Sequence, residues 1–133
     1  MKTRKMNKGF WIFGFALLLV LVGCSGGIGQ APDPLPPEEV KALNDQNEVT
    51  IVDVRGANAY AEGHIPGAIN ISSNELDQRV DEIPEEKRLI LVCQGGPVSR
   101  QALETVREAG FEEANNMAGG MSAWEEAGYP LEP

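Results

Sequence analysis

Short apolar runs alternate with helix-like segments along residues 38–133. The runs, which are rich in aliphatic and β-branched residues, predict strands over 49–54, 68–71, 88–92 and 113–117. Segments with apolar residues three or four positions apart predict helices over 38–45, 57–61, 75–83, 99–109 and 121–127. Apolar strands that alternate with helices indicate a sheet covered on both faces. We therefore expect one α/β domain with a largely parallel central sheet flanked by helices.

Residues 1–23 have the pattern of a signal peptide. A basic segment, 1–8, precedes the apolar run 10–22, whose thirteen residues are too few to span a bilayer comfortably but suit the core of a signal peptide. The run ends in Leu21-Val22-Gly23-Cys24, which resembles a bacterial lipobox. The resemblance implies cleavage after Gly23 and a diacylglyceryl group on Cys24, which would anchor the chain to a bacterial membrane outside the cytoplasm, in the periplasm or at the cell surface. The alternative is an uncleaved anchor helix with a chance cysteine.

Residues 24–37 are rich first in glycine and then in proline, which is typical of a linker, so we place the folded domain at 38–133. Apolar residues make up 42% of the chain, enough to build a core.

The charge of the chain is strongly acidic after its first residues. Four of the 11 basic residues lie before residue 9, and the remaining 7 are outnumbered by 20 acidic residues, which gives a net charge of about −13. Such a surface repels phosphate backbones, so we expect no nucleic-acid partner. We also expect a monomer.

The chain has two cysteines, Cys24 and Cys93. If Cys24 carries lipid, Cys93 has no partner in the mature chain, and a lone thiol in an exported protein is a liability unless it is used. The alternative is a buried cysteine that packs as a small apolar residue.

The segment around Cys93 favours a reactive thiol. A buried strand runs directly into Cys93, which places the thiol at the carboxyl end of a parallel strand, where open α/β sheets bind ligands. Glycines let successive N–H groups turn inward around an anion, and the N-terminus of the next helix adds positive potential. These effects favour the thiolate. The residues expected to line the substrate loop are Gln94, Gly95, Gly96, Pro97, Val98, Ser99 and Arg100.

Four segments resemble the rhodanese family and occur in the family's order. They are Ile51-Val52-Asp53-Val54-Arg55, the segment 60–70, the Cys93 loop and the segment 117–124 with its continuation at 128–131. The resemblance covers about residues 36–133 and implies a single-domain sulfurtransferase that needs no metal or organic cofactor. It implies that Cys93 takes a sulfane sulfur from thiosulfate or a similar donor, becomes a persulfide, and passes the sulfur to a thiol or cyanide.

The Cys93 loop departs from the family at one position. Many single-domain members have Cys-x-x-Gly-x-Arg-Ser, and Val98 stands where the arginine would be, whereas Arg100 lies two positions later. The loop therefore lacks a charge that could hold a donor anion, unless Arg100 folds back. Related phosphatases use a loop one residue longer, closed by an arginine, and Ser99 occupies that position here. The departure keeps two alternatives open: a sulfur carrier or binding module at the cell envelope, and a scaffold with an inert thiol.

Other marked residues have structural interpretations. Asp53 and Arg55 at a strand end are expected to pair or to brace a loop, and His64 in its Gly-His-Ile-Pro setting is expected to form a hydrogen-bonded turn rather than act as a base. Trp124 is expected to lie in the core.

Overall fold

The structure is a computed structural model that describes residues 33–133. The expected signal peptide, Cys24 and most of the expected linker lie outside the described residues. The four strands form one parallel sheet in the order β2-β1-β3-β4. They are β1 (Val49–Asp53), β2 (Ile69–Asn70), β3 (Arg88–Val92) and β4 (Asn115–Asn116). The predicted α/β fold with a largely parallel sheet is confirmed.

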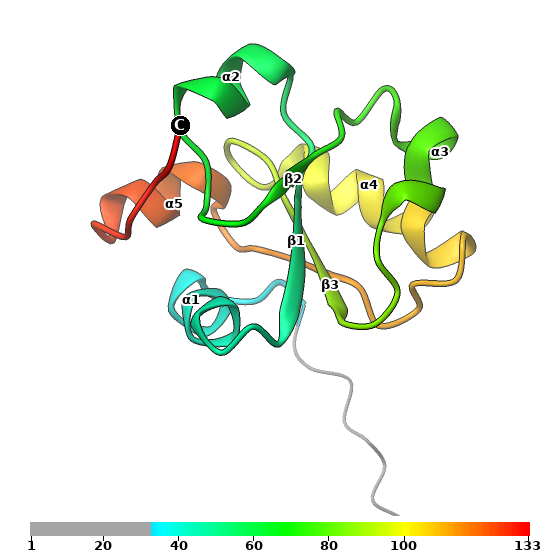
Figure 1. Ribbon diagram of the computed structural model, residues 1–133, viewed down its shortest axis with the longest axis horizontal. Helices are drawn as coiled ribbons and strands as arrows, with labels where there is room; N and C mark the ends of the chain where they lie inside the picture. The colour runs from blue at the N-terminus through cyan, green and yellow to red at the C-terminus, as the bar shows by residue number, and fades with distance from the viewer. Residues whose placement is uncertain (1–32) are drawn as a thin grey trace, which may run out of the picture.

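Helices cover both faces of this sheet. They are α1 (Pro37–Asp45), α2 (Ala57–Glu62), α3 (Leu76–Arg79), a short 3-10 helix (Val80–Glu82), α4 (Pro97–Glu108) and α5 (Gly120–Glu126). Residues of α1 and α5 pack in one apolar cluster with Ile51 and Ile90 of the sheet. Residues of α3 and α4 pack in a second cluster with Val52 and Leu91, on the opposite face (Figure 1). None of the helices in residues 33–133 is long and apolar enough to cross a membrane.

The register of the sheet brings three strand ends to one edge. Asp53, the last residue of β1, pairs with Val92 at the end of β3 and with Asn70 at the end of β2. Because the strands are parallel, the segments that follow all three strands begin side by side. Cys93, the residue after β3, therefore emerges at the carboxyl edge of the sheet between its neighbours.

Two helices differ from their predictions by more than a one-residue shift of an end. The helix expected over 75–83 splits into α3 and the 3-10 helix, and it ends before Ile83, which is extended at φ −80° and ψ 124° because Pro84 follows it. The helix expected over 99–109 begins at Pro97, since proline suits the first turn of a helix and loses no hydrogen bond there. The loop after Cys93 is correspondingly shorter, and Val98 already belongs to α4.

The packed domain begins before residue 38, so the expected linker 24–37 is too long at its end. The Leu35 side chain is fully buried, and its N–H donates to the Asn116 carbonyl oxygen at 2.9 Å. The Leu35 carbonyl oxygen accepts from the Ala118 N–H at 2.7 Å. Leu35 thus extends the sheet beyond β4, a pairing that the proline-rich sequence around it conceals.

At the other end of the domain, Trp124 is buried as expected and donates its indole N–H to the Pro130 carbonyl oxygen at 2.9 Å.

Candidate active site

The central strand β3 delivers Cys93 to the carboxyl edge of the sheet. β3 is buried along Leu89–Val92, and the Cys93 side chain is only 3% exposed. The thiol packs in the apolar cluster that also holds Val54, Ile71 and Ala102. Burial of this kind works against an ionised sulfur, so the polar groups around Sγ decide its protonation state.

Backbone N–H groups of the following loop turn toward the sulfur. The Gly96 N–H donates to Cys93 Sγ at 3.0 Å. Gly96 has φ +108°, a conformation that strains any residue with a side chain, and it brings the chain into the first turn of α4. The loop therefore directs the Gly96 amide hydrogen at the thiol, which is the orientation that the predicted anion loop requires.

Hydrogen bonds outweigh burial in setting the acidity of this thiol. Burial alone raises the pKa of Cys93, but the Ser99 hydroxyl and the N–H groups of Ser99, Gly96 and Gly95 lower it further than burial raises it. The net result is a pKa below the ordinary value of a cysteine. Ser99 is fully buried, and its hydroxyl donates to the Gly96 carbonyl oxygen at 3.0 Å. More of the sulfur is thiolate at neutral pH than in a free cysteine, which is the state that attacks sulfur.

The carbonyl groups of the loop are held on the other side by α5. The Met121 N–H donates to the Cys93 carbonyl oxygen at 2.8 Å, and the Ser122 N–H donates to the Gln94 carbonyl oxygen at 3.0 Å. A Cβ on Gly120, where φ is +57°, would lie 2.3 Å from the Cys93 oxygen. A side chain at this position would therefore push α5 off the loop. Because the Gln94 carbonyl is fixed toward α5, the N–H of the same peptide group, that of Gly95, is turned to the opposite side.

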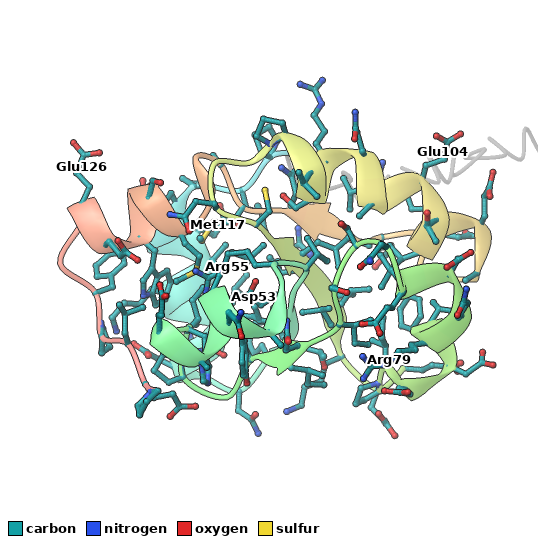
Figure 2. All side chains as sticks on the ribbon, turned by 90° about the horizontal axis from the view of Figure 1, so that it is seen from above. Asp53, Arg55, Arg79, Glu104, Met117 and Glu126 are labelled. Atoms are coloured by element: carbon teal, nitrogen blue, oxygen red, sulfur yellow. The ribbon has the colours of Figure 1, made fainter. Side chains whose placement is uncertain are left out.

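Gln94, which is exposed, also braces the loop through its side-chain amide. Its Oε1 accepts from Arg55 Nη1 at 3.2 Å, and its Nε2 donates to Ser122 Oγ at 3.1 Å. Arg55 in turn donates to Asp53 Oδ2 at 2.7 Å, so a buried ion pair supports the loop (Figure 2). The predicted pairing of Asp53 and Arg55 is present. The sequence does not predict their connection to Gln94, although all of them lie at the carboxyl ends of adjacent strands.

The remaining predicted loop residues lie at the start of α4. Pro97 opens the helix, and the Val98 side chain is 43% exposed. Arg100 follows Val98 by two residues, which is about 200° around the helix axis, so it faces away from Val98. Glu104, one turn after Arg100, points away from the body of the molecule in Figure 2. The geometry therefore does not place Arg100 in the missing arginine's position.

His64 has the structural surroundings expected of a turn. It is 4% exposed, its ring stacks on Tyr60 with centroids 3.7 Å apart, and its Nδ1 lies 3.0 Å from the Tyr60 carbonyl oxygen. Its backbone exchanges hydrogen bonds with Glu132 near the end of the chain. These contacts tie the C-terminal segment to the segment after α2.

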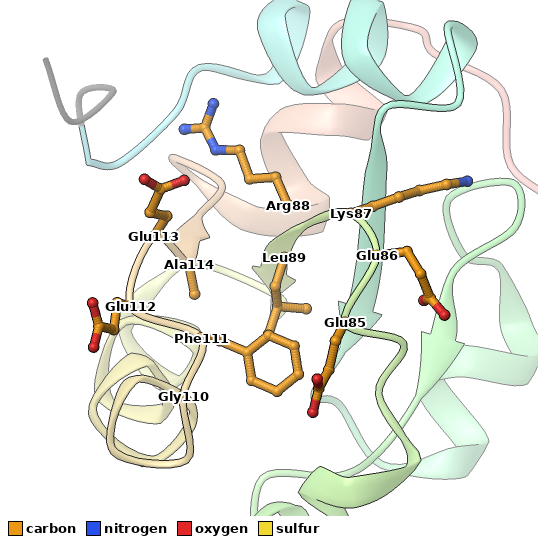
Figure 3. Close-up of a pocket in the computed structure, with 10 residues that line it drawn as sticks. All are labelled: Glu85, Glu86, Lys87, Arg88, Leu89, Gly110, Phe111, Glu112, Glu113 and Ala114. Atoms are coloured by element: carbon orange, nitrogen blue, oxygen red, sulfur yellow. The ribbon is translucent and has the colours of Figure 1, made fainter. Parts of the chain in front are cut away.

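A hollow lies at the opposite end of β3 from Cys93. It has a volume of about 450 Å³ and is lined by residues 85–89 and 110–114 (Figure 3). Phe111 and Leu89 form its apolar part, and Glu85, Glu86, Glu112 and Glu113 supply most of its charge. The lining includes no thiol, histidine or other nucleophile suited to transfer chemistry, so Cys93 remains the centre of the candidate site.

Replacing Ser99 with alanine should raise the pH midpoint of Cys93 alkylation by about one pH unit, because a hydrogen bond to a charged group is lost. Iodoacetamide labelling followed by mass spectrometry across pH 5–10 measures this midpoint. Ser72→Ala is the matched control, since the Ser72 hydroxyl bonds to Asn74 and Glu75 instead. Equal midpoints in both variants would show that Ser99 does not stabilise the thiolate.

Replacing Gly120 with alanine should unfold the protein at a lower temperature and slow the reactions of Cys93. Gly128→Ala is the control that separates backbone strain from a steric clash of the new Cβ. Gly128 also has positive φ, +73°, but a Cβ there meets nothing within 4 Å. We expect Gly128→Ala to cost about 1–2 kcal/mol and Gly120→Ala clearly more. Thermal melts of the two variants give the comparison, and equal losses would contradict the close contact between α5 and the loop.

Comparison with known proteins agrees with this geometry. The Rhodanese-like domain model matches residues 36–127. The chain is 32% identical over 93 residues to the thiosulfate sulfurtransferase GlpE of Shewanella oneidensis, covering 70% of this chain and 92% of that protein. It is 33% identical over 88 residues to the putative sulfur carrier protein YrkF of Bacillus subtilis, covering 65% of this chain and 48% of that protein.

The crystal structure of a rhodanese-related protein from Thermoplasma volcanium is similar with a TM-score of 0.69 and 25% identity, covering 76% of this chain and 98% of that one. Some curated relatives are longer, and the chain spans about half of their length. The sequence match over most of the described residues, on a parallel sheet that presents a thiol at its carboxyl edge, shows that the chain belongs to the rhodanese-like domain family.

Proposed function

We propose that the protein is a sulfurtransferase that carries a sulfane sulfur on Cys93 as a persulfide. The Cys93 thiolate attacks the outer sulfur of a donor, a bond forms between Sγ and that sulfur, and the donor's S–S bond breaks. The rest of the donor leaves with the electron pair, as sulfite if the donor is thiosulfate. An acceptor thiolate or cyanide then attacks the outer sulfur, and Sγ returns to the thiolate. No oxidant or reductant is needed.

The observation that carries this proposal is the hydrogen bond from the Gly96 N–H to Cys93 Sγ at 3.0 Å, at the carboxyl end of β3. The N–H groups of Gly95, Gly96 and Ser99 and the Ser99 hydroxyl lower the pKa of the thiol against the effect of burial. Fixed dipoles of this kind also stabilise negative charge that develops as sulfur is transferred. The sulfurtransferase named among the relatives supports the same chemistry.

A sulfur carrier that transfers only to a partner protein is the second candidate. The observation that favours it is Val98, which leaves the loop without a cation to hold a small anionic donor. A relative named as a putative sulfur carrier supports this alternative. An enzyme turns over with small donors and acceptors, whereas a carrier takes up sulfur once and stops.

Incubation of the purified protein with thiosulfate or an organic persulfide should add the mass of one sulfur atom, and cyanide should remove it. Cys93→Ser should show no gain, because the serine oxygen forms no persulfide. Intact mass spectrometry gives the uptake, and thiocyanate production over many equivalents separates the enzyme from the carrier. Lack of sulfur uptake from every donor would reject both.

The location of the protein is a further part of the proposal. The lipobox-like sequence before Cys24 supports a lipid-anchored protein at the cell envelope, with the domain held outside the cytoplasm. Cys24→Ala should leave uncleaved precursor, because the lipidated cysteine is absent. Membrane fractionation and intact mass of the expressed protein test this, and normal processing of the variant would reject lipidation.

A further inference from the structure

The face of α4 that begins at Val98 borders an uncharged hollow. The hollow has a volume of about 260 Å³. We name its lining the uncharged flank; it consists of Ser73, Asn74, Val98, Gln101, Ala102 and Thr105. The four α4 residues follow the spacing of one helix face. Hydroxyl and amide groups lie next to two apolar side chains, and no ionisable side chain takes part.

The uncharged flank lies against the thiol loop. Val98 stands between Gly96, whose N–H donates to Cys93 Sγ at 3.0 Å, and Ser99, which lowers the pKa of Cys93. Ala102 packs in the same apolar cluster as Cys93.

The turn on the other side of the flank is tied to the same strand ends. The Ser73 N–H donates to the Val54 carbonyl oxygen at 3.0 Å, and the Val54 N–H donates to the Val92 carbonyl oxygen at 2.8 Å. Val92 directly precedes Cys93. The flank is therefore joined to the Cys93 end of β3 on both of its sides, through Val98 and through Ser73.

The basic side chains of residues 33–133 provide little electrostatic attraction for a dianion such as thiosulfate at this site. Arg55 lies nearest along the strand ends, but its side chain is 8% exposed and bound to the Asp53 carboxylate. Arg79 is held by Glu75 and Glu82, and Arg100 faces away from Val98. The acidic surface adds repulsion, because the chain after residue 8 carries about −13. The attraction for negative charge that remains comes from the backbone amides and the start of α4, and the Gly96 N–H among these already donates to Sγ.

We infer that the site takes its sulfur from an organic hydropersulfide with a small uncharged organic group, in preference to thiosulfate, and that the uncharged flank binds this group. The inference rests on the proposed sulfurtransferase function and names its donor class. Val98 is then a specificity-determining residue, because an arginine there would favour the anionic donor instead.

The transfer balances without another reactant. The Cys93 thiolate attacks the outer sulfur of R–S–SH, the new Sγ–S bond forms, and the S–S bond of the donor breaks. The outer sulfur keeps its proton, and R–S⁻ leaves with the electron pair. This leaving thiolate carries one negative charge, whereas sulfite from thiosulfate would carry two, so the flank has less charge to stabilise.

The test compares donors by the second-order rate constant at which the full-length mature protein, purified in detergent, gains one sulfur atom on Cys93. The donors are thiosulfate and the hydropersulfides of N-acetylcysteine amide and N-acetylcysteine, which differ from each other by one carboxylate. We expect the amide to react at least tenfold faster than thiosulfate and severalfold faster than the carboxylate. In Val98→Arg, thiosulfate should react at least tenfold faster than in the unmodified protein.

Two further variants control for charge and folding. Glu104→Arg adds more positive charge to α4 on its outward side, and it should leave the donor preference unchanged (Figure 2). Gln101→Arg introduces the cation from a second position on the flank and should shift preference toward thiosulfate as Val98→Arg does. An equal or faster reaction of the unmodified protein with thiosulfate overturns the inference and leaves the proposed function standing. The inference is also overturned if Glu104→Arg shifts preference as strongly as the flank variants. Absence of sulfur gain from all three donors overturns the proposed function itself.

Discussion

Two hydrogen bonds from the first turn of α5 to the carbonyl oxygens of Cys93 and Gln94 control the geometry of the thiol loop. A peptide group has its N–H and C=O on opposite sides, so fixing the carbonyls toward α5 sets the direction of the neighbouring amides. The close approach requires a glycine at 120, where a Cβ would collide with the loop. The acidity of Cys93 thus depends on a helix that follows it by nearly thirty residues in the chain.

The ion pair between Asp53 and Arg55 supports the same loop at an electrostatic cost. Both side chains are nearly buried, and desolvation of two charges consumes most of their attraction unless hydrogen bonds satisfy them. Arg55 meets this condition through both Asp53 oxygens, the Gly63 carbonyl oxygen and Gln94. Because the pair is neutral as a whole, it braces the loop without making it cationic. Attraction for anions is therefore left to dipoles.

The sequence was most informative where burial alone decides the structure. The strand expected over 88–92 matches β3 because four of its residues are buried, and the position of Cys93 follows from it. The strands β2 and β4 are shorter than expected, since β2 pairs with β1 alone and β4 pairs with β3 and, on its other side, with the single residue Leu35. The role of Gln94 could not be predicted, because its partners Arg55 and Ser122 are 39 and 28 residues away. The end of the linker, predicted at residue 37, lies too far along the chain for a similar reason, because the burial of Leu35 depends on its pairing with β4.

The burial of Cys93 also bears on oxidative damage. A thiol of low pKa forms sulfenic acid readily, and a neighbouring thiol normally rescues it as a disulfide before irreversible oxidation. Cys93 is the only cysteine in residues 33–133, so this domain holds no resolving partner. With 3% of the Cys93 side chain exposed, oxidants have little access to the thiol, and this burial protects it in place of a resolving cysteine. Loosening of the loop around Gly96 would therefore shorten the lifetime of the reduced protein while its fold stayed intact.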